Sequence, residues 1–211
     1  MHSPRSLALS LALVLLPVAA QDDAQRASSE AAQREAWAHH QAHRYAQAVE
    51  GYRAAIARWP ENHRALNNLA WLLLTAEDPS ARSPQDALPL AERAVALAPD
   101  DAGILDTLAT AHDALGHPLE AARLELRALR LAPEPATFAP ALRDFARRAL
   151  TTSPDPGTRP ELIALALRGE LELKPSAPRL RAALEELEGA APLDALGHAV
   201  RAQLLSRLGG R

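Results

Sequence analysis

Three prolines mark the ends of similar segments in this chain of 211 residues. Pro60, Pro99 and Pro133 are separated by 39 and 34 residues. Alanine recurs at three places before each proline: Ala36, Ala48 and Ala55 before the first, Ala70, Ala87 and Ala94 before the second, and Ala109, Ala121 and Ala128 before the third. Four positions that recur three times predict a tandem array of one structural unit.

The residues at these positions are typical of two helices that cross closely and are joined by a sharp turn. A side chain larger than alanine at such a crossing overpacks it, at a cost of about 1–3 kcal/mol. In the third segment Gly116 permits the left-handed backbone that ends a first helix, Pro118 suits the start of a second, and Pro133 cannot continue it. Because one helical pair alone leaves an apolar face in water, we expect the pairs to stack.

This pattern resembles the tetratricopeptide repeat family, whose unit is a helix-turn-helix of 34 residues. The third repeat matches the family at Leu108, Ala109, Gly116, Ala121, Ala128 and Pro133, and the first matches it at Tyr45, Ala48, Tyr52, Ala55 and Pro60. The resemblance implies an all-α solenoid of helical hairpins wound as a right-handed superhelix, with repeats at 29–62, 63–101 and 102–135. The chain departs from the family at Glu35, where leucine is usual, and at Glu125, where an aromatic residue is common. The second repeat carries five extra residues between its helices, around residues 78–84.

Residues 136–211 continue the helical pattern with a weaker repeat signal. We expect helices at 138–150, 160–173, 178–188 and 192–208, with apolar residues at helical spacing. The order of helix, proline-rich loop, helix and proline fits a divergent fourth repeat followed by a capping helical pair. It fits non-repeat helices equally well.

The first twenty residues have the features of an export signal. Arg5 lies in a short polar start, a twelve-residue apolar stretch follows, and Val18-Ala19-Ala20 supplies small residues for a signal peptidase. We therefore expect cleavage after Ala20, a polar lead-in at 21–28, and export. Together with the signal, the family resemblance implies a bacterial protein of the periplasm or the secreted fraction. A retained anchor is the alternative, although twelve apolar residues fall short of the roughly 20 that span a bilayer. The chain has no cysteine and so no site for a lipoprotein anchor or a disulfide.

Composition and motifs argue against several classes of function. The net charge of −3 lacks the basic surplus of a nucleic-acid-binding protein. The sequence has no glycine-rich phosphate loop and no framed serine nucleophile, so we expect neither a cofactor nor catalysis. His39 and His43 are four residues apart and could chelate a metal on one face of a helix with Glu35, but solvated histidines are the alternative. Arg143, Arg147 and Arg148 form a basic patch that is either solvated or a docking surface for an acidic partner.

The resemblance also implies where a partner would bind. In this family the first helix of each repeat lines a concave groove, and the matching positions here are Gln33, Trp37, His40, Asn67, Asn68, Trp71, Asp106, Thr110 and Asp113. The two tryptophans could hold an apolar side chain, and the two asparagines could bind an extended backbone; packing between repeats is the alternative role for the tryptophans. One subgroup clamps a carboxylate terminus with basic residues, but Gln33, Gly103 and Thr107 stand where those charges belong.

These observations predict an exported scaffold or adaptor that binds a protein or peptide partner and lacks catalysis. Two alternatives stay open: a structural subunit of an envelope complex held by its C-terminal helices, and a histidine-based metal-binding protein. The sequence makes no prediction of oligomeric state.

Overall fold

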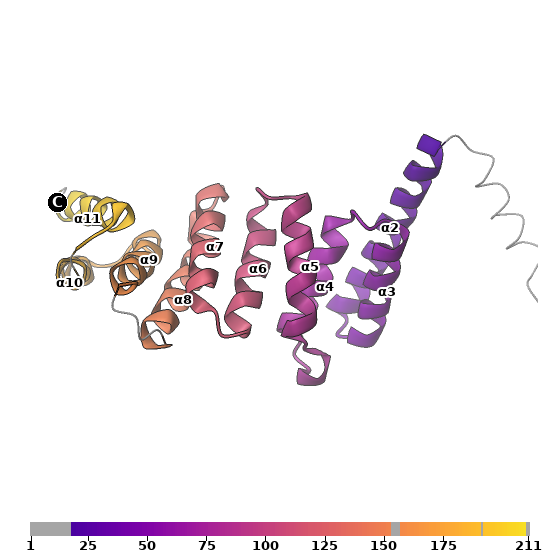
Figure 1. Cartoon of the computed structure of the whole chain (residues 1–211), viewed down its shortest axis with the longest axis horizontal. Coiled ribbons are helices and arrows are strands. Elements are labelled where there is room, and N and C mark those ends of the chain that lie inside the picture. Colours follow the sequence, from indigo (N-terminus) through magenta and orange to yellow (C-terminus); the bar gives the residue numbers. More distant parts are fainter. Residues whose placement is uncertain (1–17, 153–156, 191, 210–211) are drawn as a thin grey trace, which may run out of the picture. The chain divides into compact units, whose positions relative to one another are not determined.

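The computed structural model describes residues 18–152, 157–190 and 192–209, and in these ranges the chain forms ten α-helices, two short 3-10 helices and no strand (Figure 1). The α-helices are α2 (Val18–Gln41), α3 (Tyr45–Arg58), α4 (His63–Thr75), α5 (Pro84–Leu97), α6 (Ala102–Ala114), α7 (Pro118–Leu131), α8 (Ala139–Thr152), α9 (Arg159–Glu172), α10 (Ala177–Glu188) and α11 (Ala195–Gly209). The 3-10 helices are Pro79–Ala81 and Pro135–Thr137. The predicted all-α fold of helical pairs joined by short turns is confirmed.

The chain divides into two compact units between Arg82 and Ser83. Unit one contains α2, α3 and α4, and unit two contains α5 to α11. The division falls in the long loop of the repeat predicted at 63–101, so the two helices of that repeat belong to different units. Each unit is therefore described by itself.

The predicted alanine positions are buried. All nine repeated alanines have an exposed fraction of 0%. The crossing of α2 and α3 is also tight at Gly51. A Cβ atom added there would lie 2.8 Å from the Cβ of Ala36. Small side chains thus set the approach of the helices, as the sequence predicts.

The turn between α6 and α7 also matches its prediction. Gly116 has a φ of 85°, in the left-handed region, and Pro118 is the first residue of α7. Asp101 starts α6 by accepting hydrogen bonds from the backbone N–H groups of Gly103 and Ile104, at 2.9 and 3.1 Å. Since α7 ends at Leu131, Pro133 lies two residues beyond it.

The predicted lead-in at 21–28 is wrong, because α2 begins at Val18 and runs through these residues. The segment contains two alanines, two glutamines and one arginine, which favour helix. Arg26 also ties it to unit one, with an ion pair to Glu30 at 3.2 Å and its guanidinium 4.9 Å from the ring centroid of Trp59. The predicted signal peptide lies outside the described residues except for 18–20.

A buried polar junction joins the three helices of unit one. The Ser29 hydroxyl donates to the Ala55 carbonyl at 2.7 Å, and the Asn62 side-chain amide donates to the Ser29 hydroxyl at 2.9 Å. Asn62 also caps α4, accepting from the Ala65 N–H at 3.0 Å. Every polar side chain in the junction has a partner, which fixes α2 against the ends of α3 and α4.

Helix α9 is central to the C-terminal part of unit two. Leu162, Leu165 and Ala166 pack into a core with residues of α6, α7 and α8, whereas Leu167 and Leu171 pack into a second core with α10 and α11. A helix that is apolar on nearly every side is typical of a buried position. All four helices expected within 136–211 are therefore present and packed. None of the described helices combines the length and apolarity needed to cross a membrane.

Candidate partner-binding surfaces

The nine predicted groove residues fall into two groups, one in each compact unit. The Trp37 surface of unit one comprises Gln33, Trp37, His40, Asn67, Asn68 and Trp71, on α2 and α4. The Asp106 surface of unit two comprises Asp106, Thr110 and Asp113, on α6. Trp37 is 42% exposed, and the other eight residues are half-buried.

Aromatic contacts link part of the Trp37 surface. The ring of His40 lies edge-on to Trp37, with 5.4 Å between centroids and an interplanar angle of 74°. His40 also meets Tyr52 of α3, with 6.4 Å between ring centroids. Among the described residues Trp71 makes no ring contact with Trp37. Tyr52 was absent from the predicted site, although the sequence placed it at a family position.

Several polar atoms of the Trp37 surface lack hydrogen-bond partners among the described residues. They are the Nδ1 atom of His40 and the Oδ1 atom of Asn67, and the adjoining hydroxyl of Tyr52 on α3 also lacks one. Asn68 lies beside the Tyr52 hydroxyl without forming a well-aligned hydrogen bond. Burial, together with the nearby His43, lowers the pKa of His40, so its imidazole is neutral at pH 7. An unsatisfied buried polar atom costs about 1–3 kcal/mol.

The hypothesis of stacked histidines on α2 is wrong. The helix ends at Gln41, and His43 adopts a left-handed φ of 56° in the turn that follows. Its Nδ1 atom lies 2.8 Å from the Tyr45 hydroxyl and 3.3 Å from Oε2 of Glu77. His43 therefore joins the α2–α3 turn to the end of α4, and the described residues contain no group of three potential metal ligands.

In the Asp106 surface, the carboxylate of Asp113 already forms an ion pair. Nε and Nη2 of Arg148 donate to the two carboxylate oxygens of Asp113, each at 2.9 Å, and the guanidinium lies 5.2 Å from the ring centroid of Phe145. A bidentate pair of this kind is among the stronger surface interactions. Asp113 thus links α6 to α8, and both of its carboxylate oxygens already accept a hydrogen bond from Arg148.

The second carboxylate of this surface, Asp106, meets a buried acid on α7. Glu125 has an exposed fraction of 0%, and neither of its carboxyl oxygens has a hydrogen-bond partner among the described side chains and backbone groups. Burial and the neighbouring Asp106 raise the pKa of Glu125 to about 9, and burial also raises the pKa of Asp106. At neutral pH Glu125 therefore keeps its proton. The departure from the family at position 125 was the sequence signal for this pair.

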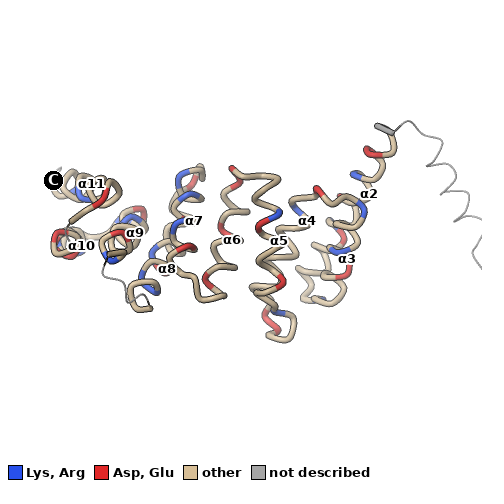
Figure 2. Tube along the Cα trace, in the orientation of Figure 1, with Lys and Arg blue, Asp and Glu red and all other residues tan. Residues whose placement is uncertain are grey.

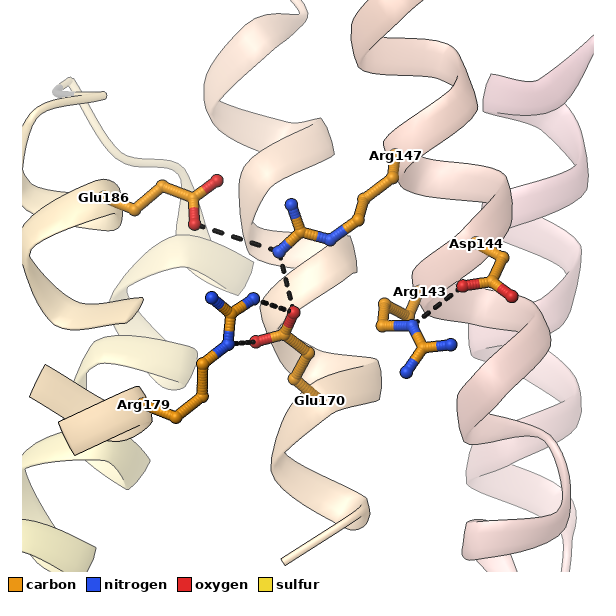
Figure 3. A network of polar contacts seen from close by, with 6 residues as sticks. All are labelled: Arg143, Asp144, Arg147, Glu170, Arg179 and Glu186. Carbon is orange, nitrogen blue, oxygen red and sulfur yellow. Dashed lines mark hydrogen bonds and ion pairs between the residues drawn. The ribbon is translucent and has the colours of Figure 1, made fainter. Parts of the chain in front are cut away.

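The three arginines of the basic patch on α8 are partly exposed, and each forms an ion pair with a carboxylate. Arg147 donates to Glu170 at 2.7 Å, and Arg143 donates to Asp144 at 2.8 Å (Figure 3). Burial by itself would raise the pKa of Glu170, but hydrogen bonds from Arg179 and Arg147 outweigh it and hold the pKa below its usual value. Figure 2 shows both signs of charge on α7, α8 and α9.

Comparison with known proteins adds the identity of the fold. No protein-family model matches the sequence, and no curated protein matches it. Two solved structures of the tetratricopeptide repeat protein MamA are similar to the chain. A crystal structure of MamA has a TM-score of 0.55 and 15% identity, over 86% of this chain and 88% of that one. A MamA RS-1 double mutant has a TM-score of 0.53 and 22% identity, over 70% of this chain and 78% of that one. Together with the buried alanine register, these likenesses show that the chain has a tetratricopeptide-like fold of helical hairpins.

Proposed function

We propose that this chain is an exported scaffold or adaptor that binds a partner protein through the first helices of its hairpins and has no catalysis of its own. The proposal rests chiefly on the Trp37 surface. There, an exposed tryptophan adjoins buried polar atoms that have no partner among the described residues. Large aromatic residues of this kind dominate the affinity of many protein interfaces. The composition of residues 1–20 supports export to the periplasm or beyond the cell.

The structure suggests how such a partner would be held. Trp37 offers its ring to an apolar side chain, with the neutral His40 beside it. Asn67 and Asn68 are half-buried on α4, about one turn before Trp71, and are the side chains proposed to bind an extended backbone. The proposed partner therefore presents an apolar side chain next to exposed backbone.

A double variant with Trp37→Ala and Trp71→Ala tests this proposal. We expect capture of the partner from an envelope extract to fall at least about tenfold, because loss of a hot-spot side chain costs about 2 kcal/mol or more. Capture is quantified by mass spectrometry, and circular dichroism confirms that the helices remain.

Trp59→Ala provides the matched control. Trp59 is half-buried at the end of α3 and stacks with Arg26, away from the predicted groove positions. The Trp59→Ala variant removes the same type of side chain and should leave capture of the partner within about twofold of the wild-type level. Equal capture by the wild-type protein and the double variant would refute the Trp37 surface as the binding site.

A further inference from the structure

His40 lies in a cluster of aromatic rings near the end of α2, and we call Trp37, His40, Tyr45 and Tyr52 the His40 cluster. Between ring centroids, His40 is 5.4 Å from Trp37, 6.2 Å from Tyr45 and 6.4 Å from Tyr52, and all three contacts are edge-on. Trp37 is 42% exposed, whereas Tyr52 has an exposed fraction of 0%. The imidazole ring of His40 therefore connects the exposed tryptophan of the Trp37 surface to the core of unit one.

The surroundings of His40 favour its neutral form. A protonated imidazole carries an N–H group on both ring nitrogens, but Nδ1 of His40 is buried and has no hydrogen-bond partner among the described residues. Helices α3 and α4 pack against α2, and the titratable groups that contact or act on His40 are Tyr45 and Tyr52 of α3 and His43 of the turn. None of these three is a carboxylate. A proton on Nδ1 would thus be buried without an acceptor, which is more costly for a charged group than for a neutral one.

We propose that protonation of His40 displaces its ring from the His40 cluster and releases the partner from the Trp37 surface, so that the surface binds at neutral pH and not in acid. The inference rests on the proposed function, since it concerns the regulation of the same surface. When the His40 ring leaves for water, Trp37 loses the contact that holds it on the inner side. An exposed side chain without a fixed orientation must be ordered again on binding, and this weakens the affinity.

The pH range of the response follows from the direction of the shift. Burial and then the charge of His43 lower the pKa of His40 in the folded chain, so the unfolded chain takes up this proton at a higher pH. As the pH falls below the unfolded value of about 6.5, His40 begins to destabilise the folded state, and its effect is complete below the folded value. His43 has the opposite role, because its Nδ1 atom lies 3.3 Å from Oε2 of Glu77 and its protonation forms an ion pair.

NMR titration of the histidine side chains in the wild-type chain tests the first step. The signals of His40 are identified by their absence from the His40→Gln variant, with His40→Asn in its place if that variant does not fold. We expect His40 to titrate with a midpoint below about 6.5. In a chain with Trp59→Phe and Trp71→Phe, Trp37 is the one remaining tryptophan, and its fluorescence should change with the same midpoint. Adding His40→Gln should abolish this change.

Release is measured on the envelope proteins that the wild-type chain captures at pH 7.5 and the Trp37→Ala, Trp71→Ala variant does not. Their capture by the wild-type chain should fall at least fivefold at one pH unit below the His40 midpoint, because binding to the neutral form alone weakens by up to tenfold per pH unit there. His198→Gln, at an exposed position of α11, is the control and should respond as the wild type does. Capture by His40→Gln should differ less than twofold between the two pH values.

Three results overturn the acid response of the Trp37 surface. They are a midpoint for His40 at or above about 6.5, capture by the wild-type chain that persists below the midpoint, and a loss of capture in acid that His40→Gln shares. The proposed function survives each of them, because capture at pH 7.5 and its dependence on the two tryptophans test it separately. If no envelope protein depends on Trp37 and Trp71 at pH 7.5, both proposals fail.

Discussion

Glu170→Ala is expected to lower the stability of the C-terminal helices by about 2–3 kcal/mol, because removing one member of a buried ion pair leaves its partners without compensation. Glu170 receives hydrogen bonds from Arg147 of α8 at 2.7 Å and from Nε of Arg179 of α10 at 3.1 Å (Figure 3). It thus joins three helices through one carboxylate. Both arginines are partly exposed, so water recovers part of the loss. Hydrogen exchange of the α9 amides measures the change directly.

The matched control for this variant is Glu188→Ala. Glu188 also pairs with an arginine, Arg201, at 3.0 Å, but both side chains are exposed, and such pairs contribute at most about 1 kcal/mol. Equal loss of protection in the two variants would contradict the proposed role of Glu170.

The stabilisation by Glu170 should also depend on pH. Because its pKa is lower in the folded chain than in the unfolded chain, its contribution is present above the ordinary glutamate pKa and is lost as the pH falls through the folded value. Glu170→Gln should therefore lose less stability than the wild type on acidification.

Gly169→Ala is expected to destabilise unit two by about 2 kcal/mol, although alanine inside a helix is normally better than glycine by about 1 kcal/mol. A Cβ atom at this position would lie 2.6 Å from the carbonyl oxygen of Ala139 and 2.8 Å from the backbone nitrogen of Arg143. Both are backbone atoms of α8, so relief requires the two helices to move apart. The urea midpoint of the helical signal should fall accordingly.

Gly103→Ala is the control for this variant. Gly103 is in the first turn of α6, where an added Cβ atom meets only Oδ1 of Asp101, at 3.4 Å. Here the helix preference of alanine should dominate, and stability should stay level or rise. If Gly169→Ala is as stable as Gly103→Ala, the close approach of α8 and α9 is not as described.

The alanine register, the Gly116 turn and the positions of α6 and α7 were predictable because they depend on local spacing and backbone preference. The start of α2 was missed because its polar segment carries no repeat signal, although its residues favour helix. The division between Arg82 and Ser83 was also missed. The five-residue insertion identified the loop but not the grouping of the helices.

Pairings between distant residues could not be predicted from the sequence. Arg148 and Asp113 are 35 positions apart, and Arg147 and Glu170 are 23 apart, so their meeting depends on how the helices pack. Glu125 was recognisable as a departure from the family, but its neighbour Asp106 was known only as a groove position. The site residues stay predictions, because binding itself depends on a partner.

Photo-crosslinking in living cells tests most directly whether the first helices contact a partner. A benzoyl-phenylalanine residue is placed at position 37 or 110, on α2 and α6, and in the control proteins at the exposed positions 53 or 130, on α3 and α7. We expect positions 37 and 110 to crosslink to the same protein, identified by mass spectrometry, and positions 53 and 130 to give no such product. Crosslinks to that protein from positions 53 and 130 alone would contradict partner binding through the first helices.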